Sequence, residues 1–538
     1  MGETLERIDC DVLVVGGGIN GAGIARDAAG RGLRVVLCEK DDLAAHTSSA
    51  SSKLIHGGLR YLEHREFGLV RKALIERELL LRSAPHIMWP LRFVMPHDAG
   101  QRPAWLIRAG LFLYDRLARR EFLPGSAGVD LRRHPAGAAL QPAFKRGFEY
   151  SDGWVDDARL VVLAALDARE HGALVLTRTT CGGVQRHPLH WSATLTGAAG
   201  EARRVNARCL VNATGPWAGT FLRGALGTQP QPSLRLVKGS HIVVRRLFEH
   251  DFAYIFQHPD GRIVFAMPYE REFTLIGTTD LDFRGDPDAV AIDEAETAYL
   301  CALANRYFRQ PIGPADVVWS YAGVRPLVDD DGASAQAASR DFRLAHDTGG
   351  APLLTVLGGK ITTFRKLAEE AVDWIAPQMG NSKQGWTADA CLPGGDLFGA
   401  RPSNRSVLEF DQWTAAMQQR YRWLPPALLR RYARAYGARM VVLLEGCRTL
   451  SDLGPEIVPG LYPAEADYLV THEWARSAAD ILWRRSKLGL HLPAGSAAKV
   501  DAWIADRGAR ASATSPQSGS AAPECPSPSS RPPAPTSA

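Results

Sequence analysis

The strongest constraint in the sequence is a glycine-rich turn near its start, GGGING, which lies between two short apolar segments. Residues 11–15 (DVLVV) and 33–38 (LRVVLC) are short, apolar and rich in β-branched side chains, which is typical of buried parallel strands. Residues 19–29 between them are mostly small and are predicted to form a helix. The segment is therefore predicted to be a βαβ unit, which places the chain in the α/β class.

The glycines of this turn follow the GxGxxG pattern of a Rossmann-type dinucleotide site. Gly16 makes the tight turn, Gly18 lets the backbone approach a pyrophosphate, and Gly21 lets the helix pack closely on the strand. The helix N-terminus then faces the phosphates with the positive end of its dipole. Glu39 follows the second strand, where a carboxylate can bond an adenosine ribose. The alternative is a glycine turn in an ordinary βαβ unit.

Three separate segments favour FAD over NAD as the dinucleotide. The run TSSASS at residues 47–52, followed by KLIHGG, offers hydroxyl and N–H groups to phosphates and a flavin edge. The VNATG strand end at 211–215 resembles the second FAD fingerprint of flavoproteins with two dinucleotide-binding domains. The LGGKITT turn at 357–363 can supply donors where a reduced flavin develops negative charge. The predicted cofactor-binding residues are Gly16, Gly18, Asn20, Gly21, Glu39, Thr47, Ser48, Ser52, Lys53, His56, Gly57, Gly58, Ala213, Thr214, Gly215, Gly359, Lys360 and Thr362.

The order of predicted elements indicates three structural parts and a tail. Residues 240–244, 263–267 and 273–277 are predicted antiparallel strands of a second domain inserted into the first. Residues 425–445 and 463–485 have helical spacing and indicate an all-helical C-terminal domain. We expect an FAD-binding Rossmann-type domain at 1–90, 146–235 and 318–385, a substrate and membrane-facing domain at 91–145 and 236–317, a helical domain at 386–507 and a disordered tail at 508–538.

Composition and charge argue against several classes of protein. The net charge is only +5 over 538 residues, without a dense basic block, which disfavours a nucleic-acid-binding protein. The eight cysteines are scattered without CxxC pairs or Cys/His metal spacing, which predicts no metal site and a reducing compartment. The segment DDDG at residues 329–332 lacks EF-hand spacing and is predicted to form a loop. No apolar signal segment or bilayer-length apolar run is found, so we expect a cytoplasmic location.

Four basic residues stand near the glycine-rich or strand-end segments: Arg60 (HGGLRYLE), Arg325 (SYAGVRPL), Arg340 (SRDF) and Lys360 (GGKITT). Converging guanidinium and ammonium groups suit a dianion such as a phosphate monoester. Any single one of them is more often a surface charge or part of a structural ion pair. Together they favour a phosphate-carrying substrate over the carboxylate substrate of an amine or amino-acid oxidase.

The motifs taken together closely resemble those of the FAD-dependent glycerol-3-phosphate dehydrogenases of the aerobic bacterial type. The resemblance covers residues 9–505 and rests on GGGINGAGIARDAAGRGL, TSSASSKLIHGGLRYLE, RGFEYSDGWVDDARL, LVNATGPW, KGSHIVV, IGTTD, YAGVRPL and LGGKITTFRKLAE. It implies oxidation of sn-glycerol 3-phosphate to dihydroxyacetone phosphate, with electrons passed from reduced FAD to a membrane quinone. The residues that it implies for substrate binding are Arg60, Tyr61, Arg325, Arg340 and Lys360.

This reaction requires a hydride to leave C2 of the substrate and a proton to leave the C2 hydroxyl group. His241 and His56 are the candidate bases, because an imidazole titrates near neutral pH. Alternatively, Arg325 and Lys360 stabilise an alkoxide-like oxygen while water carries the proton. In another interpretation His56 binds the flavin through the HGG turn. The predicted catalytic residues are therefore His241, His56, Arg325 and Lys360.

Residues 102–120 (RPAWLIRAGLFLYDRLARR) are predicted to form a basic amphipathic helix. Such a helix either anchors the protein to an anionic membrane surface, on the inner face of the cell membrane, or packs on the protein's own core. One side of the helix is polar and the other apolar, with Arg108, Asp115, Arg116 and Arg119 against Trp105, Leu106, Ala109, Phe112, Leu113 and Leu117.

Three alternatives stay open: O2 as the acceptor of an oxidase, a non-catalytic flavin-binding membrane scaffold, and a homodimer formed through the helical domain.

Overall fold

The computed structural model describes residues 5–63, 65–98, 100–228, 233–258, 262–329 and 341–514. Arg340, most of the loop at 329–332 and residues 515–538 of the predicted tail lie outside these ranges. The last helix, α13 (Ser496–Thr514), continues past residue 507, where the helical domain was predicted to end. That prediction was wrong because the Ala-rich composition at 508–514 is compatible with helix as well as with a tail.

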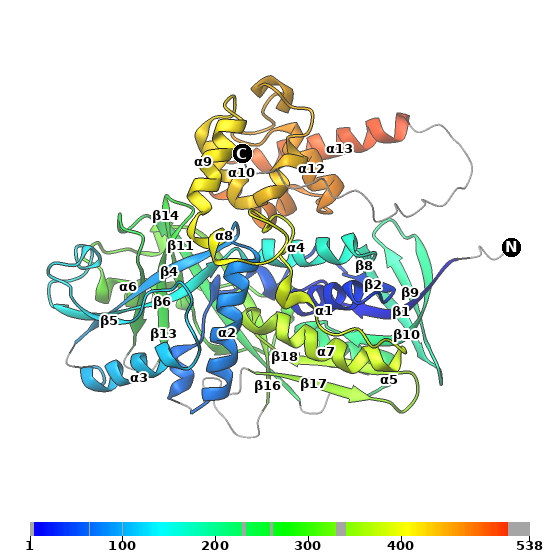
Figure 1. Ribbon diagram of the computed structural model, residues 1–538, viewed down its shortest axis with the longest axis horizontal. Helices are drawn as coiled ribbons and strands as arrows, with labels where there is room; N and C mark the ends of the chain where they lie inside the picture. The colour runs from blue at the N-terminus through cyan, green and yellow to red at the C-terminus, as the bar shows by residue number, and fades with distance from the viewer. Residues whose placement is uncertain are drawn as a thin grey trace.

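The first sheet confirms the predicted Rossmann-type fold. Its central strands are all parallel, and α1 (Ile19–Gly30), α4 (Asp157–Glu170) and α7 (Phe364–Gln378) pack on one another against it. Figure 1 shows these helices alongside the sheet on the right of the molecule. The order is β17 (Phe342–Asp347), β18 (Leu353–Gly358), β10 (Ala202–Asn212), β1 (Glu6–Val15), β2 (Val35–Cys38) and β7 (Leu174–Leu176), with β9 (Trp191–Gly197) beside β10 and β8 (Thr179–Arg186) beside β9.

The second sheet is mostly antiparallel, as predicted for the inserted domain. One face packs on α6 (Glu294–Tyr307), and the other packs on α2 (Phe67–Ser83) and α3 (Ala104–Arg116). The order is β15 (Leu281–Asp282), β11 (Leu234–Arg245), β14 (Phe273–Gly277), β13 (Ile263–Tyr269), β12 (Ala253–Gln257), β4 (Met88–His97), β6 (Arg146–Val155) and β3 (Leu54–Ile55), with β16 (Val317–Val328) paired to β11 and β5 (Ala127–Asp130) to β6.

Strand pairing corrects the predicted domain boundaries. The strands β3, β6 and β16 were assigned to the FAD-binding part, but all three are hydrogen-bonded into the second sheet. β6 pairs with β4 along its whole length, and β16 pairs with β11 from Leu234 to Val244. The chain therefore passes between the two sheets repeatedly, and the second sheet includes segments that were predicted to belong to the FAD-binding part.

The C-terminal helices form their own apolar core above the two sheets (Figure 1). The helix predicted at 463–485 is interrupted: α12 (Pro463–His472) ends where Glu473 turns inward to bind Arg159 of α4, and a π-helical turn (Asp480–Arg485) follows. The helix predicted at 425–445 is likewise interrupted after α10 (Pro426–Tyr436), at Gly437 with φ +53°. The remaining helices of this region are α8 (Asn404–Leu408), α9 (Phe410–Arg420) and α11 (Met440–Leu443).

No helix within the described ranges is long and apolar enough to cross a bilayer.

Candidate functional site

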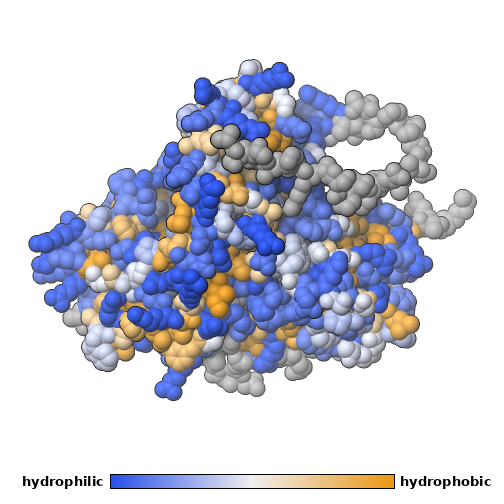
Figure 2. Space-filling model, in the orientation of Figure 1, coloured by the Kyte–Doolittle hydropathy of each residue, from blue (hydrophilic) through white to orange (hydrophobic). Residues whose placement is uncertain are grey.

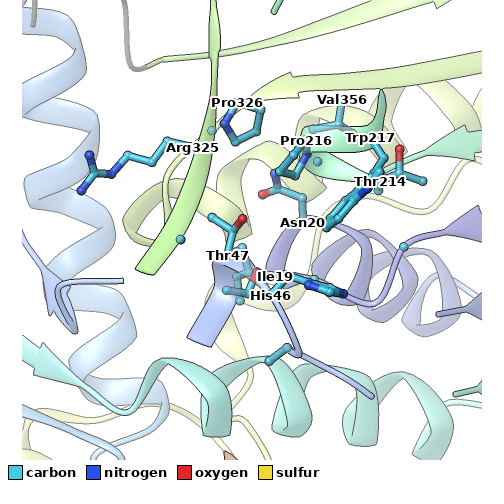
Figure 3. Close-up of a pocket in the computed structure, with 18 of the residues that line it drawn as sticks. Ile19, Asn20, His46, Thr47, Thr214, Pro216, Trp217, Arg325, Pro326 and Val356 are labelled. Carbon is cyan, nitrogen blue, oxygen red and sulfur yellow. Dashed lines mark hydrogen bonds between the residues drawn. The ribbon is translucent and has the colours of Figure 1, made fainter. Parts of the chain in front are cut away.

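A cavity of about 620 Å³ opens at the carboxyl ends of β1, β2 and β10 and continues to the second sheet. Figure 3 shows Asn20, Thr214 and Trp217 on one side of it and Arg325 on the other. The residues predicted from the sequence that line this cavity are Gly16, Gly18, Asn20, Glu39, Thr47, Ser48, Ser52, His56, Tyr61, Ala213, Thr214, Gly215, Arg325, Gly359, Lys360 and Thr362.

The glycine turn is packed too tightly for side chains. Gly16 has φ +112°, and a Cβ built on it would lie 2.5 Å from the carbonyl oxygen of Ala213. A Cβ on Gly21 would lie 1.9 Å from the carbonyl oxygen of Gly16, which explains its place in the motif although it does not line the cavity. The helix begins at Ile19, whose N–H donates to Ser48 Oγ over 3.0 Å. The turn, the helix N-terminus and a hydroxyl thus face one part of the cavity.

Glu39 stands at the end of β2, where the ribose of a dinucleotide is expected. Its Oε2 accepts a hydrogen bond from Gly17 N over 2.6 Å, and its Oε1 accepts one from Asp41 N over 2.9 Å. Burial raises the pKa of the Glu39 carboxyl above its ordinary value. The two backbone donors fix the direction of the carboxylate beside the glycine turn.

The turn after β18 closes the opposite end of the cavity. Gly358 and Gly359 have φ values of +73° and +96°, and Asn20 Nδ2 donates to Gly358 O over 3.3 Å. Asn20 Oδ1 is buried and has no hydrogen-bond partner in the described structure. Lys360 Nζ lies 3.6 Å from the centre of the Tyr61 ring. The polar ring system of a cofactor would require such groups: an unmatched acceptor, Asn20 Oδ1, and a cation, Lys360 Nζ, beside a left-handed glycine turn.

Lys53, Gly57 and Gly58 were predicted to bind the cofactor, but they do not line the cavity. The Lys53 side chain is buried, and its Nζ binds both oxygens of Asp157, at 2.8 and 3.0 Å. Gly57 N donates to Tyr114 Oη over 2.8 Å. Lys53 lies directly before β3, which pairs with β6, and its side chain is directed away from the cavity.

His241, one of the two predicted bases, is not among the residues that line the cavity. It is fully buried, stacks on Tyr321 with ring centres 4.7 Å apart, and shares a hydrogen bond of 3.0 Å between its Nε2 and Ser52 Oγ. Burial, together with the nearby Arg325 and Lys53, lowers the pKa of His241 well below its ordinary value. Ser52 lines the cavity and His241 does not, and the hydrogen bond to Ser52 Oγ connects His241 with the site.

The predicted cations divide into those that line the cavity and those that do not. Arg325 lines it, forms an ion pair with Asp280 and donates through Nη2 to Thr278 Oγ1 over 2.9 Å. Figure 3 shows its guanidinium directed away from the residues around Thr214. Lys360 lines the cavity as well, whereas Arg60 does not, and Arg340 lies outside the described residues.

Several wall residues were not singled out from the sequence. Trp217 and His46 meet edge to face with ring centres 4.8 Å apart, beside the Glu39 end. Trp217 and Thr278 stand within the motifs LVNATGPW and IGTTD, so those motifs contained a usable signal. Residues 179–184 also line the cavity, but their strand lies in a stretch without any recognisable pattern.

The fold and the cavity define the class of the protein. A parallel sheet carries the glycine turn and the ribose-facing acid, and one continuous cavity runs from them to a second, antiparallel sheet. These are the parts of a dinucleotide-dependent oxidoreductase. The glycine cradle, Glu39 and the unmatched Asn20 acceptor fit FAD. The family model described as FAD dependent oxidoreductase matches residues 11–365.

Relatives narrow the class further. The chain is 54% identical to a glycerol-3-phosphate dehydrogenase of Pseudomonas aeruginosa, over 90% of this chain and 92% of that protein. It is 49% identical to the aerobic glycerol-3-phosphate dehydrogenase of Escherichia coli (92% and 97% covered) and 49% identical to a D-erythritol 1-phosphate dehydrogenase of Brucella abortus (92% and 97%). The X-ray structure of a Bacillus halodurans glycerol-3-phosphate dehydrogenase complexed with FAD matches with a TM-score of 0.73 and 25% identity, covering 93% of this chain and 90% of that one.

The chain therefore belongs to the FAD-dependent glycerol-3-phosphate dehydrogenase family. It is a flavoenzyme, and the predicted cofactor, FAD, is confirmed.

Proposed function

We propose that this enzyme oxidises sn-glycerol 3-phosphate to dihydroxyacetone phosphate and passes the electrons from FAD to a membrane quinone. The observation that carries the proposal is that Arg325 and Lys360 both line the flavin cavity. Arg325 belongs to β16 of the second sheet, and Lys360 follows β18 of the first sheet. Two cations that line one cavity suit a phosphate dianion better than an uncharged alcohol.

The chemistry that FAD supplies when bound is the acceptance of a hydride, which here leaves C2 of the substrate. Arg325 and Lys360 bind the phosphate and fix the carbon chain relative to the cavity. The proton of the C2 hydroxyl must leave for a carbonyl to form. We assign its acceptance to His56, the imidazole of the predicted pair that lines the cavity. His241 orients the Ser52 hydroxyl through their hydrogen bond.

The name of one relative supports a second candidate substrate. The Brucella abortus protein is named for D-erythritol 1-phosphate, which also carries a phosphate and a polyol chain. Because Arg325 and Lys360 would bind either phosphate, the cations alone do not discriminate between the two. Anaerobic mixing of the holoenzyme with each compound separates them through the rate of flavin bleaching. We expect faster bleaching with glycerol 3-phosphate, and faster bleaching with erythritol 1-phosphate would reassign the substrate.

The acceptor is tested separately. An oxidase would release hydrogen peroxide in air, whereas a quinone-dependent dehydrogenase turns over with a soluble quinone analogue under anaerobic conditions. We expect turnover with the quinone and little peroxide. Peroxide formed in proportion to substrate would identify an oxidase, and an absence of bleaching with either phosphate would leave only a flavin-binding scaffold.

We place the enzyme on the inner face of the cell membrane through α3. The Trp105 and Phe112 side chains are 71% and 52% exposed, and Leu106 and Leu113 are exposed beside them, while Leu111 faces the core. Figure 2 shows apolar surface along the lower edge of the molecule, in the region of α3. Exposed aromatic and aliphatic side chains on a helix that also carries Arg108 and Arg116 suit an anionic lipid surface.

A further inference from the structure

The helical C-terminal region reaches the flavin site through one buried carboxylate. Asp42 lies in the segment 40–45, between the ribose-facing Glu39 and the serine-rich wall of the cavity. Its side chain is almost fully buried and binds two arginines of the π-helical turn Asp480–Arg485. Arg484 Nε lies 2.6 Å from Asp42 Oδ2, and Arg485 Nη2 lies 2.8 Å from Oδ1, with a further short contact from Arg485 Nη1.

These arginines are themselves held in place. Arg484 also pairs with Asp480 of the same turn, and Asp480 Oδ2 accepts a hydrogen bond of 2.6 Å from Arg178, next to β7. Arg178 returns to the segment through its backbone, since its N–H donates to Asp41 O over 2.7 Å. Arg485 Nη2 donates in addition to Glu473 O over 2.6 Å. Segment 40–45 is thus held in place by a network of ion pairs and hydrogen bonds rather than by one surface ion pair.

The segment in turn shapes the cofactor turn. Ala44 N donates to Gly17 O over 3.3 Å, and the Leu43 side chain packs so closely that a Cβ on Gly17 would lie 2.9 Å from Leu43 Cδ2. Ala44 has φ +60°, a left-handed conformation that is sterically disfavoured for a residue with a Cβ. A backbone conformation of this kind persists only where its surroundings impose it. Asp42 stands two residues before Ala44, and its two ion pairs fix this part of the segment.

We propose that Asp42, Arg484 and Arg485 are positioning residues of the flavin site, through which the helical region maintains FAD affinity. They do not touch the substrate end of the cavity. Their role is to keep segment 40–45 against the glycine turn, so that Glu39 and the N–H groups of the turn stay in the cofactor-binding arrangement. This inference depends on FAD and not on the identity of the substrate or the acceptor.

The test measures FAD retention by the full-length holoenzyme. Diluted protein is passed through an ultrafiltration membrane, and FAD in the filtrate gives the dissociation constant. Asp42→Asn removes the charge between two arginines, and we expect the constant to rise about tenfold or more, because hydrogen bonds to charged groups are among the strongest single contacts. Arg484→Gln removes the less buried partner and should raise it by a smaller factor; it decides the question if Asp42→Asn does not fold.

A control variant separates positioning from general damage. Glu465→Gln weakens a buried ion pair with Arg431 inside the helical region. It should lower the melting temperature while FAD dissociation stays within about twofold of the wild type. An unchanged FAD constant in Asp42→Asn, or an equal rise in Glu465→Gln, would overturn the proposal.

Discussion

At the scale of single residues, the glycine turn leaves almost no freedom for substitution. Gly21 does not line the cavity, yet a methyl group there would collide with the carbonyl oxygen of Gly16. The collision is with backbone, which no rotamer change relieves. The turn would have to open, and with it the N-terminus of α1.

We therefore expect Gly21→Ala to be purified with little or no FAD, as measured by the ratio of flavin to protein absorbance. Gly68→Ala is the matched control, because a Cβ on Gly68 in the first turn of α2 meets nothing within 4 Å. Its flavin content should equal that of the wild type. Normal flavin content in Gly21→Ala would show that the helix and strand can separate without cost to the site.

Arg325 provides a second prediction at this scale. Arg325→Ala should raise the KM for glycerol 3-phosphate by roughly 10- to 100-fold, since hydrogen bonds to charged groups contribute about 1.5–3 kcal/mol. The FAD spectrum should be unchanged. The control is Arg235→Ala on the adjoining strand β11, whose guanidinium binds Asp282 at the surface. An unaltered KM in Arg325→Ala would remove Arg325 from the phosphate site.

Much of the site could be predicted from the sequence because its residues stand in contiguous motifs. The direction in which each side chain points could not be predicted. Ser52 faces the cavity and its neighbour Lys53 turns into a buried ion pair with Asp157. His241 is covered by Tyr321, its partner in the β11–β16 pairing. Such a contact joins residues far apart in the sequence, so the local sequence pattern does not predict it.

At the scale of elements, α3 combines a buried side with an exposed apolar one. Leu111 and Tyr114 pack into the second sheet's core, while Trp105 and Phe112 face outward. Spacing alone predicted the helix and left its environment open between membrane and core. The structure shows that the helix has both kinds of side chain on different faces, so its exposed face is the part that a membrane would contact.

Replacing Trp105 and Phe112 together with alanine should weaken binding to vesicles containing anionic lipid by about tenfold or more, because each large apolar side chain contributes about 1.5–3 kcal/mol when fully buried. Co-sedimentation measures this directly. Leu408→Ala on α8 is the control, since Leu408 is similarly exposed but lies in the helical region. Equal binding by the double variant and the wild type would assign membrane attachment to another surface.

Strands were easier to predict than sheets. The local pattern of short apolar segments separated by turn residues predicted β11, β13 and β14 to be antiparallel strands, and they are. The same pattern could not assign β6 and β16 to one of the two sheets, because the local sequence of a strand does not depend on the sheet that it joins. Membership is decided by hydrogen bonding to β4 and β11, which is a property of the assembled fold.

At the scale of the whole molecule, His86 lies where the helical region meets the rest of the protein. It is fully buried, and both ring nitrogens lack a hydrogen-bond partner in the described structure. Cβ atoms built on Gly394 and Gly437 would touch its ring, so it fills the junction. Burial, with Arg159 and Arg434 nearby, lowers the pKa of His86 well below its ordinary value.

A histidine kept neutral in the folded state stabilises the protein only above its unfolded pKa, near 6.5. As the pH falls below that value the unfolded chain takes up a proton that the folded chain does not, and stability is lost by about 1.4 kcal/mol per pH unit. We expect His86→Gln to remove this contribution. Denaturant unfolding of both proteins between pH 6.5 and 5 measures it, and parallel pH profiles would show that His86 is not the group responsible.

The interleaving of the two sheets has a consequence for biosynthesis. β1 leaves the ribosome first, but its neighbour β10 pairs with it only from Arg203 onward, and β18 begins at Leu353. At about 5–20 residues per second, β10 follows β1 by roughly ten to forty seconds. During that interval β1 can pair with β2, but its other edge has no partner, and strands of the other sheet are emerging beside it. An unpaired apolar edge of this kind makes the nascent chain prone to aggregation until β10 has been translated.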